Sequence, residues 1–140
     1  MKKLTILFIA ALLGTFTVSA QSGNIGVATT TPNSKLQVEG SLAVGYRTVD
    51  SSTALGVWDY VLEFQGQSTD SVTLPNATTC KGRIYMVKNT SPTSGAVCRV
   101  KPISAQTIDG ETVWYLYGTN EVASFVSDGS NWKVKKKKKP

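Results

Sequence analysis

The sequence predicts an all-β protein, in which an extended N-terminal arm precedes a small antiparallel β-sandwich or partial barrel. Apolar residues recur at a period of two along much of the chain, and helical periodicity is almost absent. Period two is the spacing that places alternate side chains on one face of a strand. Turn-forming dipeptides interrupt these stretches often, which is typical of sandwiches and barrels.

Four segments are expected along the chain. We assign a signal peptide to residues 1–20, an extended arm with a trimerisation strand to 21–56, a β-sandwich head to 57–134 and a disordered lysine-rich tail to 135–140. The tail should be disordered because consecutive lysines from Lys135 to Lys139 repel one another and cannot be buried.

The start of the chain has the three parts of a cleavable secretory signal. Two lysines stand at positions 2 and 3, residues 4–13 are apolar, and small residues at 18–20 precede a cut at Gln21. The apolar run is about half of the roughly 20 residues that a membrane-spanning helix needs. We therefore expect a secreted protein of the periplasm or cell exterior, with no transmembrane anchor after cleavage.

The net charge of +6 comes from the two ends of the chain. Two leader lysines and five tail lysines account for seven of the 15 cationic residues, so eight remain against nine acidic residues. A nearly neutral body gives no basis for a specific nucleic-acid partner. The lysine tail is either a solvated end or a tether to an anionic surface.

Alternating residues in the arm predict one strand with an apolar face. The face consists of Leu36, Val38, Leu42 and Val44, with Gly40 between them. A lone ribbon leaves such a face in water, whereas three copies around an axis would bury it and would crowd most closely at a glycine. We therefore expect a homotrimer with these five residues at its interface. The alternative is that the strand packs on the β domain of its own chain.

In the head, strands are expected near residues 58–64, 72–74, 83–88, 96–101, 113–117, 122–126 and 132–134. A turn with proline and glycine predicts that 83–88 and 96–101 form a hairpin. Asp109-Gly110 and Asp128-Gly129 mark two further tight turns. Residues 113–117 are apolar on both faces, as expected of a central strand.

Two segments of the chain resemble known families. The first comprises residues 24–27, 29–32 and 35–40, and is similar to the "IGIGTTTP..KLxVxG" segment of phage tail-fibre proteins and of secreted fibre-like proteins of Bacteroidota. This chain has Ala28 where glycine is usual, and it carries one copy of the motif.

The second segment is similar to a C-terminal β domain of the same fibre-like proteins. Its pieces occur in order as Val72–Pro75, Gly82–Tyr85 (GRIY), Lys88–Ser91 (KNTS), Gln106–Gly110 (QTIDG) and Ser127–Trp132 (SDGSNW). The resemblance implies a trimeric, β-rich, non-enzymatic structural or adhesive protein. The chain lacks the long shaft of a full tail fibre, and the signal peptide favours a protein exported by a cell over a virion component.

No catalytic, metal or cofactor site is expected. The sequence has no histidine, which removes Ser-His-Asp and Cys-His catalysis and the commonest metal ligand. Two cysteines are too few for a closed zinc site, and no phosphate-binding glycine loop is present. Asp59 and Glu63 share a strand face, but about 13 Å separates them, more than the roughly 9.5 Å limit for a glycosidase pair. Asp109, Glu111 and Asp128 could ligate calcium, although turn chemistry explains the Asp-Gly pairs.

Cys80 and Cys98 are expected to form a disulfide, because export exposes them to oxidising conditions. The expected hairpin opposes this pairing, since it places Cys98 opposite Met86. A bridge therefore requires residues 78–82 to fold back toward Cys98.

Several aromatic residues are candidates for stacking on a sugar, namely Trp58, Tyr60, Trp114, Tyr115, Tyr117 and Trp132. The alternative for most of them is packing in the core. Trp114 and Tyr115 point to opposite faces of a strand, so both are buried only if that strand is central.

The favoured function is a secreted, non-enzymatic structural or adhesive protein, tail-fibre-like, in which a trimerising arm presents a β head domain. The alternative is a monomeric carbohydrate- or ligand-binding β module of the periplasm or cell surface. The expected partner is another copy of the chain in the first case and a surface glycan in the second.

Overall fold

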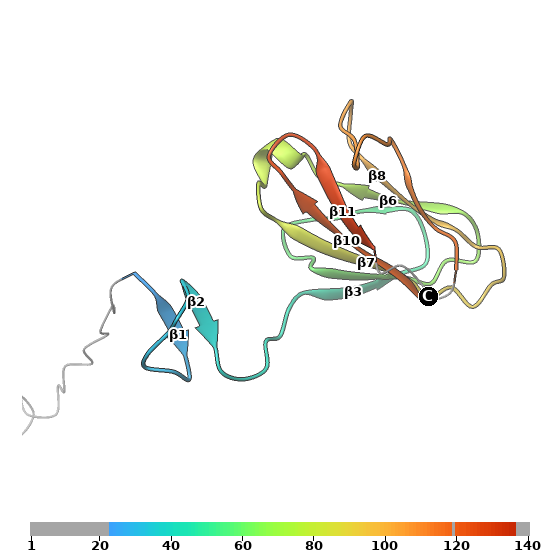
Figure 1. Cartoon of the computed structure of the whole chain (residues 1–140). Helices are drawn as coiled ribbons and strands as arrows, with labels where there is room; N and C mark the ends of the chain where they lie inside the picture. The colour runs from blue at the N-terminus through green and yellow to red at the C-terminus, as the bar shows by residue number, and fades with distance from the viewer. Residues whose placement is uncertain (1–22, 119, 137–140) are drawn as a thin grey trace, which may run out of the picture. The chain divides into compact units, whose positions relative to one another are not determined.

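The computed structural model describes residues 23–118 and 120–136 (Figure 1). Backbone contacts divide the chain into two units, Met1–Leu42 and Ala43–Pro140. The expected boundary at residue 56 lies further along the chain than this division, because two strands before it belong to the second unit. The predicted signal peptide and its cleavage site lie outside the described residues.

The first unit contains a parallel two-stranded ribbon of β1 (Ile25–Val27) and β2 (Leu36–Val38). Ile25 lies opposite Leu36, and Val27 lies opposite Val38. Because side chains alternate along a strand, these four apolar residues share one face of the ribbon. Ile25 is 64% exposed and Leu36 is 60% exposed, so the described residues leave this face largely open to water.

One departure from the fibre-like motif, Ala28, lies in the loop of the ribbon at a position with a left-handed backbone. Ala28 adopts a φ of +59°, in the left-handed region that an L side chain enters at a cost. Glycine, the usual residue at this place in the motif, avoids that cost. Ala28 is therefore a strained residue at a turn position that suits glycine.

Replacing Ala28 with glycine is expected to stabilise the ribbon by about 0.5–1 kcal/mol, which is the left-handed penalty less the added entropy of the unfolded chain. Hydrogen exchange of the two bridging amides, Ile25 N–H to Lys35 O and Glu39 N–H to Val27 O, measures it. Their exchange should slow by about two- to fivefold. As a control, Ala54→Gly should destabilise the second unit, because Ala54 lies in a strand with an ordinary φ. Faster exchange in Ala28→Gly would show that the backbone at Ala28 is not strained.

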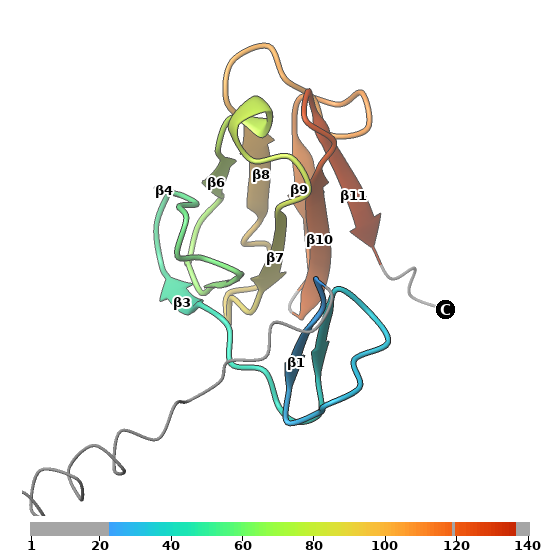
Figure 2. The same cartoon turned by 90° about the vertical axis from the view of Figure 1, so that its left-hand side faces the viewer.

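The second unit consists of two β-sheets packed face to face (Figures 1 and 2). Its strands are β3 (Tyr46–Val49), β4 (Thr53–Ala54), β5 (Val61–Phe64), β6 (Asp70–Leu74), β7 (Ile84–Asn89), β8 (Cys98–Pro102), β9 (Trp114–Leu116), β10 (Glu121–Ser127) and β11 (Trp132–Lys136), with a short 3-10 helix η1 (Ala77–Thr79) after β6. One sheet has the order β11-β10-β7-β5-β3 and the other has the order β4-β6-β8-β9. The all-β prediction is confirmed.

From β3 to β8 the chain alternates between the two sheets, and each new strand pairs in parallel with the one two places earlier. Each connection between parallel strands thus runs through a strand of the opposite sheet. The later strands β9, β10 and β11 add antiparallel pairs. The sandwich is therefore mixed, and the predicted antiparallel arrangement is wrong for β3 to β8.

The predicted hairpin of 83–88 with 96–101 is also wrong. These residues form β7 and β8, which lie in different sheets: β7 pairs with β5 and β10, whereas β8 pairs with β6 and β9. The turn between them carries the chain from one sheet to the other. Alternating apolar residues give the same pattern in both arrangements, because either way one strand face points inward.

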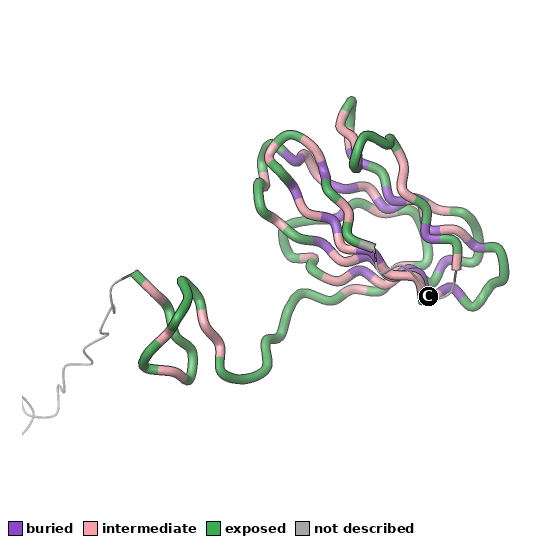
Figure 3. The backbone as a smooth tube through the Cα atoms, in the orientation of Figure 1, coloured by how far each residue is buried: buried purple, intermediate pink, exposed green. Residues whose placement is uncertain are grey.

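The core lies between the two sheets, as the buried positions of Figure 3 show. Its fully buried members include Leu62, Phe64, Val72, Leu74, Tyr85, Val87, Val100, Ile108, Leu116, Phe125 and Trp132. Apart from Ile108, which lies in the segment between β8 and β9, they come from alternate positions of strands in both sheets, as period two requires. Asn89 is buried among them and donates to the carbonyls of Leu116 (2.9 Å) and Ala96 (3.3 Å), which ties β7 to the opposite sheet.

Both predicted Asp-Gly turns are confirmed. Asp109 and Gly110 have φ values of +49° and +96°, and Ile108 exchanges two backbone hydrogen bonds with Glu111 around them. Left-handed conformations at both central positions are the geometry that Asp-Gly favours. Gly129, at φ +98°, lies in the turn that joins β10 to β11.

The expected disordered tail from residue 135 needs correction at its start. Strand β11 continues to Lys136, and Lys135 pairs with Ser124 of β10, so the lysine run begins inside a strand. Residues 137–140 lie outside the described residues.

The expectation of a central strand at residues 113–117 is also wrong. Residues 114–116 form β9 at the edge of the four-stranded sheet. Among the described strands, β9 pairs with only one neighbour, β8.

The structure does not contain the predicted disulfide: Cys80 and Cys98 are both free thiols in it. Residues 77–79 make the turn η1, and the Cys80 thiol that ends it donates to Asn76 O at 3.3 Å. Cys98 is buried in β8, opposite Asp70 and Leu116. Residues 78–82 thus turn locally and do not fold back to Cys98.

Two free thiols of unequal reactivity are therefore expected. Burial raises the pKa of the Cys98 thiol to about 12, so little thiolate forms at neutral pH. With an aromatic disulfide reagent, the folded protein should react rapidly at one thiol at most, and the unfolded, non-reduced protein should react at two. Cys80→Ser should remove the rapid phase only. If the unfolded, non-reduced protein has no reactive thiol, Cys80 and Cys98 form a disulfide after all.

Candidate functional site

The carboxylate of Asp59 is held in a structural ion pair. The Nε and Nη2 atoms of Arg47 each lie 2.9 Å from an Asp59 oxygen, and Gly56 N–H donates to Asp59 at 2.8 Å. The hydrogen bond from Arg47 is the main cause that lowers the pKa of Asp59, against the opposing effect of its burial. Arg47 also donates to Thr53 Oγ1 and to Ala54 O. The pair therefore fixes the loop before β5 and leaves Asp59 unsuited to acid-base chemistry.

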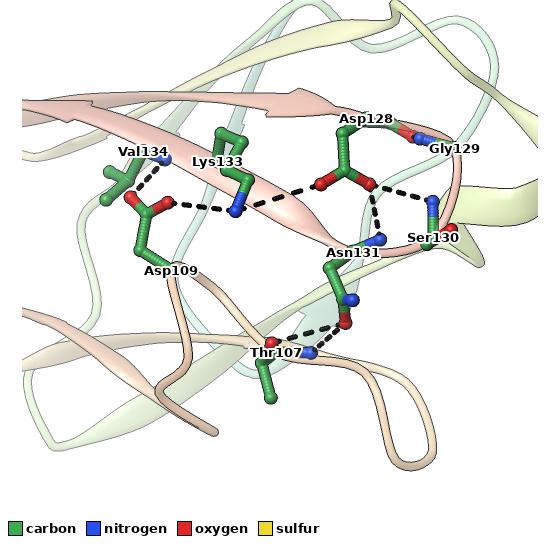
Figure 4. Close-up of polar contacts among 9 residues, drawn as sticks. Thr107, Asp109, Asp128, Gly129, Ser130, Asn131, Lys133 and Val134 are labelled. Atoms are coloured by element: carbon green, nitrogen blue, oxygen red, sulfur yellow. Dashed lines mark hydrogen bonds and ion pairs between the residues drawn. The ribbon is translucent and has the colours of Figure 1, made fainter.

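Two of the three carboxylates that could have ligated calcium, Asp109 and Asp128, flank a lysine (Figure 4). Lys133 Nζ lies 3.6 Å from an Asp109 oxygen and 3.8 Å from an Asp128 oxygen. Hydrogen bonds from the backbone N–H groups of Asn131 and Ser130 lower the pKa of Asp128. The ammonium group occupies the space between the two carboxylates, so turn chemistry explains these residues.

The QTIDG and SDGSNW motifs lie side by side, and hydrogen bonds between them hold β11 against the 107–109 segment. Asn131 Oδ1 accepts hydrogen bonds from the backbone N–H of Thr107 (2.8 Å) and from its hydroxyl (3.2 Å) (Figure 4). Trp132 and the 107–109 backbone exchange two hydrogen bonds, and Asp109 Oδ2 accepts from Val134 N–H. Sequence reasoning assigned no joint role to these motifs, although paired Asx residues in two turns were a usable signal.

These hydrogen bonds fix Trp132 in the core, so the expected role of Trp132 in ligand stacking is wrong. Trp132 is 0% exposed, donates from Nε1 to Pro75 O at 3.2 Å, and lies 5.7 Å from the Tyr85 ring centroid. Trp114 also points inward and packs against the core, with its Nε1 buried and unpartnered among the described residues. Neither indole is placed to meet a ligand.

Four of the expected stacking residues reach the surface, at two separate places. Trp58 and Tyr60 precede β5 and do not belong to it, so the expected strand over 58–64 begins only at Val61. They line a shallow, open hollow of about 450 Å³ together with Val44, Gly45, Val57, Asp59, Gly82, Arg83 and Ile84. Tyr115 lies on the outer face of the other sheet, and its ring stacks on Tyr117, which directly follows β9.

The hollow is mainly apolar, and Trp58 is 88% exposed beside it. Val57 is also largely exposed, while Asp59 is engaged by Arg47. Exposed large apolar side chains that gather at one place are typical of protein contacts. The hollow therefore has the character of a packing surface more than that of a catalytic cleft.

The predicted trimer interface is only partly one surface. Leu36 and Val38 lie in β2, but the strand ends there, so Gly40, Leu42 and Val44 do not continue it. Val44 belongs to the second unit and lines its hollow. Ile25 and Val27 complete the apolar face instead. Sequence reasoning missed them although the Ile-Gly-Val triplet already alternates at period two.

Within residues 23–118 and 120–136, no group of acidic or cysteine side chains is arranged to hold a metal ion. No helix in this part of the chain is long and apolar enough to cross a membrane. Comparisons with protein-family models, with curated proteins and with solved structures found no match.

Proposed function

We propose that this chain is a secreted, non-enzymatic structural or adhesive protein that self-associates through its β1–β2 ribbon and presents the second unit as a head. The observation that carries this proposal is the open apolar face of the ribbon, formed by Ile25, Val27, Leu36 and Val38. A two-stranded ribbon is marginal in water without a covering element. A second copy of the same face is the simplest cover.

Three copies around one axis suit this ribbon, and the fibre-like resemblance implies the same number. Burying four Leu, Ile or Val side chains in each of three chains would gain roughly 18–36 kcal/mol gross. Association and ordering costs are of comparable size. Association therefore removes from water an apolar face that a single ribbon leaves exposed.

Light scattering on the protein that begins at Gln21 tests the proposal. The expected mass at micromolar concentration is that of three chains. The exported fraction supplies the material, and mass spectrometry of its N-terminus checks export at the same time. A monomer mass would overturn the self-association, and an intact Met1 in the exported fraction would overturn the cleavage.

A further inference from the structure

The outer face of the sheet β4-β6-β8-β9 differs in chemistry from the other exposed surfaces. Arg99 of β8 lies between Ser71 of β6 and Tyr115 of β9 in one cross-strand row. Thr73 and Lys101 form the next row on the same face. This face is therefore built of hydroxyl, cationic and aromatic groups, whereas the exposed aliphatic side chains of the second unit gather around the hollow.

Two tyrosines form a preorganised pair at the edge of this face. The rings of Tyr115 and Tyr117 are stacked, with centroids 5.4 Å apart and planes inclined by 14°. Tyr115 is 41% exposed and Tyr117 is 63% exposed. The Glu121 carboxylate accepts from the Tyr117 backbone N–H at 2.8 Å, which fixes the backbone that carries the second ring. Rings fixed in this way lose little conformational entropy when a ligand stacks on them.

Arg99 supplies a cation that no acid of the described residues engages directly. Its side chain makes no hydrogen bond or ion pair there, and its buried Nε is unsatisfied. The neighbouring acid, Asp70, instead accepts from the hydroxyls of Ser52 and Ser68 at 2.8 Å. Hydrogen bonds from Ser52 and Ser68 are the main causes that lower the pKa of Asp70, and the charge of Arg99 adds a smaller effect across space. Arg47, by contrast, is fully engaged with Asp59. A guanidinium left unpaired beside exposed aromatic rings is suited to a planar anion such as a carboxylate.

We propose that this face binds a carboxylated carbohydrate, such as an oligosaccharide of uronic acids. The tyrosine rings stack on the apolar faces of the sugar rings, and Arg99 pairs with a sugar carboxylate. Thr73 and Lys101 offer polar groups to neighbouring hydroxyls and acids. The site is separate from the β1–β2 ribbon and does not rest on self-association.

Calorimetric titration with an oligogalacturonate, and with its methyl ester as the neutral counterpart, tests the site. The acid should bind, and the ester should bind at least tenfold more weakly. Tyr117→Ala and Arg99→Gln should each weaken binding of the acid at least tenfold. Their matched controls are Tyr46→Ala, at a tyrosine 61% exposed in the other sheet, and Arg83→Gln; both should stay within twofold of the parent.

Each contrary result overturns the proposal. Absence of binding removes the site, equal binding of the ester removes the acidic specificity, and an equal loss in Arg83→Gln assigns the binding to general positive charge. Near-ultraviolet circular dichroism checks that each variant remains folded. Repeating the titration on Leu36→Asp, which should be monomeric, separates the two proposals, because glycan binding should persist when self-association is lost.

Discussion

Replacing Trp132 with alanine is expected to lower the free energy of unfolding of the second unit by about 3–5 kcal/mol. The indole is fully buried, packs against Tyr85, and donates to Pro75 O. Alanine leaves a cavity between the sheets and an unpaired carbonyl. Urea denaturation followed by tyrosine and tryptophan fluorescence measures the change through a lower midpoint at an unchanged slope.

The matched control is Trp58→Ala, which removes the same side chain at a position 88% exposed. We expect this variant to stay within about 0.5 kcal/mol of the parent when the protein is monomeric. Similar losses in both variants would contradict the burial of Trp132. A Trp132→Ala protein of parental stability would instead return that residue to the surface and revive its role in ligand stacking.

If the protein is the trimer proposed above, replacing Leu36 with aspartate is expected to convert it to a monomer, the largest change in assembly that one substitution should produce. Leu36 lies opposite Ile25 on the apolar face of the ribbon. Three copies of the variant would place three unpaired carboxylates in one interface, each at a cost of several kcal/mol. Light scattering should report the mass of one chain, while the second unit unfolds at its parental temperature.

The control for charge is Gln37→Glu in the same strand. Gln37 lies on the opposite face of the ribbon, where its Oε1 accepts from Asn33 N–H at 2.8 Å and its Nε2 donates to a Glu39 oxygen at 3.1 Å. Glutamate can retain the first bond but loses the second, so this control also adds a local repulsion with Glu39 outside the apolar face. This variant should remain trimeric although it carries one added negative charge per chain. A Leu36→Asp protein that remains trimeric would show that the chains associate elsewhere, and the apolar hollow around Trp58 would become the interface to test.

Local features of the sequence determined the strands and the turns. Period-two alternation placed strands at β6, β7, β10 and β11, because alternation reports only that one face of a segment is buried. Asp109-Gly110 fixed a tight turn, because both residues tolerate left-handed backbone conformations. The absence of histidine excluded the commonest general base and metal ligand, because side-chain identity alone sets which chemistry a chain can supply.

Tertiary structure alone decided which strands pair and which aromatic side chains remain exposed. Backbone hydrogen-bonding groups are the same at nearly every residue, so β7 has no local signal that selects β5 and β10 over β8. The choice follows from burying all apolar faces at once. In the same way, Tyr115 reaches solvent because it points from the outer face of its sheet, and Trp132 is enclosed because the 107–109 segment closes over β11. The sequence specifies two faces for each strand, and only the complete packing determines what covers each face.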